Sequence, residues 1–191
     1  MTSPFDARPI VVAVAGPNGA GKTTFHEAHL QPSGLRFVNA DDLARELDVG
    51  AYEAAEVARS LRETLVEQGE SFVFETVFSD PVGEKLAFLQ RAQAKGYAVI
   101  LCFIGIDGPA RSEERVAMRV LQGGHDVPSR KLEERFPRTL ANLARAIGEL
   151  PSVLVFDNGD LRRPFRMVAR FERGRMVERH APVPRWVPRG R

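Results

Sequence analysis

The 191-residue sequence has little of what marks secreted, membrane-spanning or nucleic-acid-binding proteins. Its one cysteine, Cys102, cannot form an intrachain disulfide, so nothing indicates an oxidising compartment. No apolar run approaches the length that crosses a bilayer, and residues 1–9 lack the apolar stretch of a signal peptide. The net charge is only +2, which disfavours a polybasic nucleic-acid-binding protein. We therefore expect a cytoplasmic protein with no membrane and no nucleic-acid partner.

Strand-like and helix-like segments alternate along most of the chain. Apolar runs rich in β-branched residues predict strands at 10–15, 35–38, 71–77, 98–104 and 153–156. Helices are expected between them, at 22–30, from residue 43, and around the stripe Ala54, Val57, Leu61 and Leu65. A further helix is expected from residue 82 to near Gly96. This alternation predicts an α/β fold with a parallel, doubly wound sheet.

Two departures from the alternation stand out in the second half of the chain. Residues 109–122 and 128–150 predict two successive helices, a helical excursion over about 109–150. Residues 165–180 alternate around Glu172-Arg173-Gly174-Arg175, which predicts a C-terminal β-hairpin. We expect one domain over residues 1–180, which is long enough to bury a sizeable core. The Pro- and Arg-rich tail, 181–191, carries Trp186, which either docks on the domain or contacts a partner.

A glycine-rich loop follows the first predicted strand. Gly16-Pro17-Asn18-Gly19-Ala20-Gly21-Lys22-Thr23 has the P-loop spacing, and Thr24 continues it into the next predicted helix. Glycines let consecutive backbone N–H groups curl around the β- and γ-phosphates, and the helix N-terminus adds partial positive charge. Lys22 supplies a cation, and the Thr23 hydroxyl is positioned to ligate Mg²⁺. The loop predicts the cofactors ATP and Mg²⁺ on a P-loop NTPase fold.

The same loop sequence occurs in ABC-type transport ATPases. Leu121-Gln122-Gly123-Gly124-His125 is similar to their Leu-Ser-Gly-Gly-Gln signature, and residues 153–157 are similar to their Walker B strand. However, Gln122 and His125 break the signature, and Asn158 stands where that class has a carboxylate that activates water. An ATPase that drives a partner protein is therefore an alternative. A nucleotide-binding regulator without an acceptor substrate is another.

A kinase interpretation accounts for more residues. A kinase holds an acceptor hydroxyl in line with the γ-phosphate and needs a carboxylate near the phosphates. Asn39-Ala40-Asp41-Asp42 follows the second predicted strand, whose carboxyl end should lie beside the P-loop. We favour Asp41 over Asp42 as the base, and the other carboxylate is expected to cap the helix from Leu43. Glu75 and Thr76 close the third strand, where they are candidates to fix a substrate hydroxyl.

Two basic faces are expected on the helical excursion. Arg115 and Arg119 lie on one predicted helix face with no acidic residue three or four positions away. Such a face is unfavourable unless an anion lies against it. The members of the two faces are Arg111, Arg115 and Arg119, and Lys131, Arg135 and Arg138. Because a glycine turn joins the helices, we expect a lid that closes on the triphosphate, and the alternative is a solvated basic surface.

Taken together, these residues resemble the zeta-toxin-like P-loop kinases, in the branch described as predicted ABC-type ATPases or kinases. The resemblance spans about residues 10–160, and its most specific piece is Gly123-Gly124-His125-Asp126-Val127-Pro128. The other matching pieces are 17–24, Phe37-Val38-Asn39-Ala40-Asp41, Glu75-Thr76, Arg115-Val116, Arg119-Val120, Arg135-Phe136 and Phe156-Asp157-Asn158.

The resemblance implies a Mg-ATP-dependent kinase acting on a small hydroxyl substrate, with an antitoxin protein as a partner. Its better-known members phosphorylate UDP-N-acetylglucosamine. By resemblance, Asp41 is the base, Lys22 contacts the phosphates, and Arg115 or Arg119 acts with Arg135 on the transferring phosphoryl group. Zeta toxins proper carry an arginine a few residues after the base, for which Arg45 is the candidate here. The remaining assignments are Asp157 and Asn158 near the nucleotide base, and Asn39, Asp42, Glu75, Thr76 and His125 around the acceptor.

Overall fold

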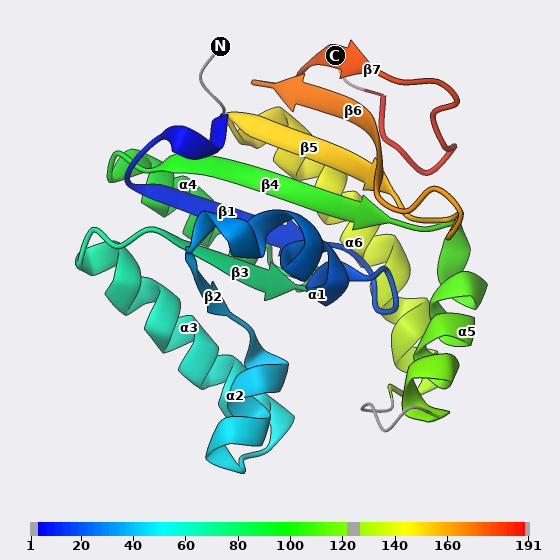
Figure 1. Ribbon diagram of the computed structural model, residues 1–191, viewed down its shortest axis with the longest axis horizontal. Helices are drawn as coiled ribbons and strands as arrows, with labels where there is room; N and C mark the ends of the chain where they lie inside the picture. The colour runs from blue at the N-terminus through cyan, green and yellow to red at the C-terminus, as the bar shows by residue number, and fades with distance from the viewer. Residues whose placement is uncertain (1–3, 122–126, 190–191) are drawn as a thin grey trace.

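The computed structural model describes residues 4–121 and 127–189, and its centre is a seven-stranded sheet (Figure 1). The strand order is β2-β3-β1-β4-β5-β6-β7. The first five strands run parallel, and β6 and β7 add an antiparallel hairpin at one edge. Their bounds are β1 Ile10–Ala15, β2 Arg36–Val38, β3 Phe72–Thr76, β4 Ala98–Gly105, β5 Ser152–Asp157, β6 Arg166–Glu172 and β7 Arg175–Arg179. The predicted α/β fold, with its mostly parallel sheet and terminal hairpin, is confirmed.

Helices cover both faces of this sheet (Figure 1). The long helices α3, α4 and α6 pack on one face, and α1 with the turn after it packs on the other. The helix bounds are α1 Lys22–Phe25, α2 Ala40–Leu47, α3 Ala51–Glu67, α4 Glu84–Ala94, α5 Gly108–Leu121 and α6 Ser129–Glu149. None of the helices within the described ranges is long and apolar enough to cross a membrane.

Strand β1 explains why the first apolar run lacks polar residues. Val11, Ala13 and Ala15 face the core under α3, α4 and α6, whereas Ile10, Val12 and Val14 face the core under α1. All six side chains are fully buried, as expected for a central strand of a sheet covered on both faces. The strand therefore delivers the P-loop from the middle of the molecule.

Three helices differ from the prediction. The helix expected at 22–30 is α1 followed by a π-helical turn, His26–Leu30. Helix α2 begins at Ala40 and not at Leu43, because the Asn39 side chain accepts a hydrogen bond from the Asp41 N–H (2.9 Å) and caps it. The expectation that Asp41 or Asp42 caps this helix was wrong.

Helix α3 buries the predicted face in part. Ala54 and Leu65 are buried as expected and Leu61 packs partly buried against the core, whereas Val57 is only half-buried. The apolar pattern did not predict that Arg62 is buried on this helix, because the residue is charged.

The two successive helices of the excursion are present as α5 and α6. The turn between them, with Gly123, Gly124 and His125, lies outside the described residues. The lid function stays a prediction.

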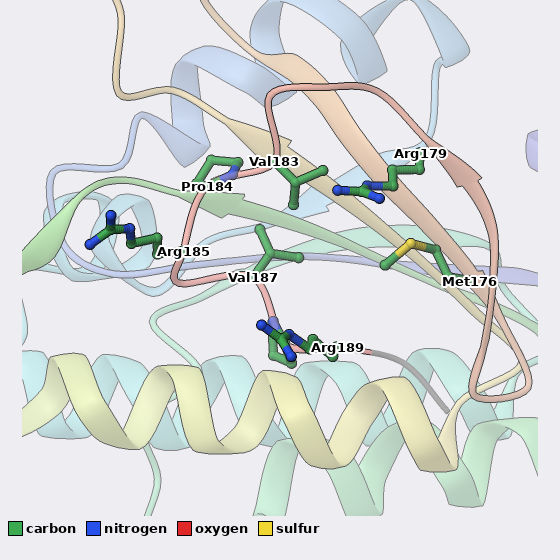
Figure 2. A pocket seen from close by; sticks show the side chains of 8 residues that line it. Met176, Arg179, Val183, Pro184, Arg185, Val187 and Arg189 are labelled. Carbon is green, nitrogen blue, oxygen red and sulfur yellow. The ribbon is translucent and has the colours of Figure 1, made fainter.

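The tail docks across the sheet face that α3, α4 and α6 also cover, and it reaches β4. The Trp186 ring lies 6.0 Å from the Phe103 ring, between centroids, and covers Gly105 at the end of β4. Residues of β7 and the tail also line a cavity of about 780 Å³, where Met176 and Arg179 face Val183 and Val187 (Figure 2). Phe103 pairs with Ala15 of β1, so the Trp186 contact lies one strand from the strand that carries the P-loop.

Candidate active site

The P-loop packs so closely against its neighbours that three of its positions require glycine; one is Gly19, with φ +71° and a Cβ position 2.9 Å from the Ser112 carbonyl oxygen. Gly16 has φ +149°, and a Cβ there would lie 2.1 Å from the Ile104 carbonyl oxygen of β4. Gly21, which precedes α1, has φ +87°, and a Cβ there would lie 2.8 Å from Asn158 Nδ2. Because positive φ and this crowding both exclude a side chain, the loop is held in one compact turn.

A carboxylate joins the two functional side chains at the end of the P-loop. Lys22 is only 6% exposed; its Nζ donates to the Pro17 carbonyl oxygen (3.2 Å) and lies 3.6 Å from Glu75 Oε1. The Thr23 hydroxyl donates to Glu75 Oε2 (2.8 Å), and Asn39 Nδ2 donates to the same oxygen at 3.4 Å. The parallel register explains this meeting, because Ala15 of β1 pairs with Thr76 of β3.

Opposing effects act on the pKa of Lys22. Burial lowers the pKa of this ammonium group, and the carboxylates of Glu75 and Asp41 oppose the shift. The Arg119 guanidinium lowers the pKa further, so its positive charge acts at the P-loop from the second half of α5.

The two candidate bases have different surroundings. Asp41 is exposed in the first turn of α2 and lines a cavity of about 180 Å³ together with Asn39, Glu75 and Thr76. Asp42 is paired with Arg45, three residues along the same helix. The Asp41 carboxylate is therefore the one that faces the cavity beside the P-loop.

The predicted lid arginines are not equivalent. Helix α5 contacts the P-loop directly, because the Ser112 hydroxyl donates a hydrogen bond to the Asn18 carbonyl oxygen (2.6 Å). Arg115 donates to the Asn158 carbonyl oxygen (2.7 Å), and Arg119 lies one turn further, exposed. Arg135 is half-buried on α6 and has no hydrogen bond or ion pair within residues 4–121 and 127–189.

Asp157 and Asn158, which were expected near the nucleotide base, lie at the end of β5, where Asn158 contacts the P-loop. Asn158 is 3% exposed, and its side chain donates to the Ala20 carbonyl oxygen (2.8 Å). Asp157 forms an ion pair with Arg166 (3.2 Å) at the end of β5, which lies two strands from β1. The carboxylate beside Thr23 is therefore Glu75 of the adjacent strand, and not the Asp157 that an ABC-type interpretation requires.

Sequence reasoning missed two cations at the cavity that Asp41 lines. Arg62 of α3 and Lys85 of α4 both line it, opposite in charge to Asp41 and Glu75. The sequence contains one signal for Arg62. This arginine lies at helical spacing from three residues that are buried, Ala54, Ala58 and Leu65. A charge on a buried helix face is uncommon and indicates a local partner or a ligand.

Comparison with solved structures supports the fold. A chain of the PezAT toxin–antitoxin system of Streptococcus pneumoniae is 18% identical with a TM-score of 0.61, over 85% of this chain and 72% of that chain. The AvrRxo1-ORF1:ORF2 complex with ATP gives 20% identity and a TM-score of 0.69, over 91% of this chain and 61% of that one. A putative kinase from Chloroflexus aurantiacus is 17% identical with a TM-score of 0.59, over 82% of this chain and 92% of that chain.

Sequence comparison identifies the family. No curated protein shows significant sequence similarity to the chain. The family model "Zeta toxin", in contrast, matches residues 1–166, which is most of the chain. The chain therefore belongs to the zeta toxin family, and it is a phosphotransferase with the P-loop kinase fold.

Proposed function

We propose that the protein transfers the γ-phosphoryl group of ATP to a hydroxyl group of a small acceptor. The observation that carries this proposal is the position of Glu75. Its carboxylate contacts Lys22 and Thr23 of the P-loop and also lines the cavity that Asp41 faces. The phosphate loop and an acceptor cavity with a candidate base therefore adjoin each other at the carboxyl ends of β1, β2 and β3.

Each group has a separate role in the proposed reaction. The amides of residues 16–21 and Lys22 hold the β- and γ-phosphates. Thr23 and Glu75 are oxygen donors of the kind that Mg²⁺ prefers; they would hold this ion, which neutralises charge on the phosphates. The acceptor oxygen attacks the γ-phosphorus, Asp41 takes its proton, and the bond to the β–γ bridging oxygen breaks to release ADP. Arg115 or Arg119, acting with Arg135, stabilises the charge on the moving phosphoryl group.

The family suggests what the acceptor and the protein partner are. UDP-N-acetylglucosamine is the first acceptor to test, because the better-known members of the family phosphorylate it. Two of the similar structures come from pairs of proteins, the PezAT toxin–antitoxin system and the AvrRxo1-ORF1:ORF2 complex. This supports an antitoxin-like protein partner.

The test is phosphorus NMR of ATP mixed with UDP-N-acetylglucosamine and a panel of other UDP-sugars. We expect a new phosphomonoester signal, reduced about 10²–10⁴-fold in rate by Asp41→Asn. The matched control is Asp42→Asn, whose carboxylate is engaged by Arg45 and whose loss should change the rate little. Undiminished transfer in Asp41→Asn would show that another group is the base. Hydrolysis that no acceptor accelerates would favour the ATPase alternative.

A second experiment addresses toxicity. Expression of the wild type should arrest growth, and Lys22→Ala should relieve the arrest, because the P-loop then lacks its phosphate-binding cation. A wild type that leaves growth unchanged would count against a toxin.

A further inference from the structure

Arg62 is a buried cation whose hydrogen-bonding capacity is largely unused. It lies in the middle of α3 and is 4% exposed. Its guanidinium lies over the rings of Phe74 and Phe88, 5.0 and 5.5 Å from their centroids. Its nearest carboxylate is Glu84, at 4.0 Å, and its Nε has no hydrogen-bond partner in the described part of the chain.

The surroundings do not compensate this charge. Glu84 also pairs with Lys85, so two cations share one carboxylate. The aromatic faces attract a guanidinium but accept none of its N–H hydrogen bonds. Burial accordingly lowers the pKa of Arg62. Leaving a buried charge without full pairing costs folding free energy, which an apolar side chain at this position would avoid.

Arg62 and Lys85 line the cavity that Asp41 and Glu75 also line. The cavity therefore has acidic groups, from the end of β3 and the first turn of α2, and basic groups, from α3 and α4. A ligand that matches both sets has a hydroxyl group for Asp41 and a negatively charged group for the two cations. The guanidinium fork suits a phosphate or a carboxylate, which it binds through parallel N–H donors.

We propose that the acceptor is an anionic hydroxyl compound, and that Arg62 together with Lys85 binds its phosphate or carboxylate group. The proposal rests on the proposed kinase function and specifies its substrate class. The cavity measures about 180 Å³, below the roughly 300 Å³ at which pockets for drug-sized ligands begin. It therefore encloses a compact acceptor, such as a sugar phosphate or a hydroxy acid, and only part of a nucleotide sugar.

The binding test uses inorganic phosphate with the P-loop already saturated by Mg²⁺ and adenylyl imidodiphosphate, a non-hydrolysable ATP analogue. Phosphate should then raise the melting temperature further, and Arg62→Met should weaken this second effect at least tenfold. Arg59→Met is the matched control, because Arg59 lies on the same helix, exposed and paired with Glu56. Arg62→Met without ligand should melt no lower than wild type, since it removes a poorly paired buried charge.

Two results of the binding test would overturn the proposal: phosphate that has no effect once the P-loop is saturated, or equal phosphate binding by Arg62→Met and wild type. If Arg62→Met fails to fold, Arg62→Lys serves instead. It keeps the charge but loses the fork, so it should bind phosphate more weakly than wild type.

The turnover test compares each neutral acceptor with its phosphate ester, which keeps all the other hydroxyl groups. The pairs are glycerol and glycerol 3-phosphate, glucose and glucose 6-phosphate, and N-acetylglucosamine and N-acetylglucosamine 1-phosphate. The anionic member of a pair should be phosphorylated faster, and Arg62→Met should raise its KM at least tenfold without changing the KM for ATP. Preference for the neutral members would overturn this inference and leave the kinase intact. Transfer to none of them would count against the kinase, while phosphate binding would still decide the role of Arg62.

Discussion

At the scale of single residues, Lys22 connects burial with nucleotide binding. Its pKa is lowered by burial, so it loses its proton at a lower pH than the ordinary lysine value of 10.5. Between the two values the unfolded chain binds more protons than the folded protein, so the free energy of unfolding should rise with pH there. Nucleotide affinity should move in the opposite direction, because the phosphates bind the charged form.

The Kd for adenylyl imidodiphosphate, measured by calorimetry, should begin to increase at a pH below 10.5. In Glu75→Gln the increase should begin at a still lower pH, because that variant removes the carboxylate that most strongly raises the pKa of Lys22. A Kd that is constant up to the ordinary lysine pKa would contradict the prediction.

At the scale of elements, the start of α2 fixes the candidate base. The Asn39 cap satisfies the N–H of Asp41 itself. Asn39→Ala should lower the free energy of unfolding by roughly 0.5–2 kcal/mol and reduce phosphoryl transfer, because the turn that carries Asp41 loses its cap. Urea unfolding and the kinase assay measure the two effects.

Asn39→Ser is the matched control for the cap. Serine keeps a capping oxygen but cannot reproduce the amide donation to Glu75. We expect it to recover most of the stability. Equal stability of Asn39→Ala and wild type would show that the cap is unimportant.

Helix α6 holds the loop that follows β3. Asn142 is buried and donates to the carbonyl oxygens of Phe78 (3.0 Å) and Asp80 (2.9 Å), and Thr139 donates to that of Val77 (3.0 Å). Asn142→Ala leaves two carbonyl groups without this donor and should lower the free energy of unfolding by about 1–3 kcal/mol. Thr139→Val, which removes one bond and keeps the shape, should cost less. Thermal or urea unfolding orders the three proteins, and the reverse order would contradict this account.

The sequence predicts some of these elements well and others poorly, for physical reasons. Strands 10–15 and 98–104 are recognisable because a strand buried on both faces needs unbroken apolar residues. The P-loop is recognisable because its conformation requires glycine at fixed positions. The face of α3 is recognisable only in part: Ala54 and Leu65 follow the apolar periodicity, but Arg62 occupies a buried position that this periodicity assigns to a hydrophobic residue. The contact of Glu75 with Thr23 depends on the register between β1 and β3, which are distant in sequence.

At the scale of the whole molecule, the P-loop is supported from several directions. Glu75 contacts it from β3, Ser112 from α5 and Asn158 from the end of β5. Figure 1 shows β3, β5 and α5 meeting near the carboxyl ends of the parallel strands, with the hairpin continuing the sheet beyond β5. A phosphate site fixed in this way needs little rearrangement when nucleotide binds, which is the condition for effective electrostatic stabilisation.

The docked tail gives the protein a built-in optical probe. Trp186 is its only tryptophan, so fluorescence emission reports one contact, that of the indole ring with Gly105 and Phe103. A methyl group at Gly105 would lie 2.1 Å from the ring, so Gly105→Ala should displace the tail and shift the emission towards the red. Gly50→Ala serves as the control, because Gly50 has a φ of -66° and free space around it. If neither variant changes the emission, the tail does not occupy this position in solution. If only Gly105→Ala changes it, the emission wavelength of Trp186 can be used to follow whether a protein partner displaces the tail.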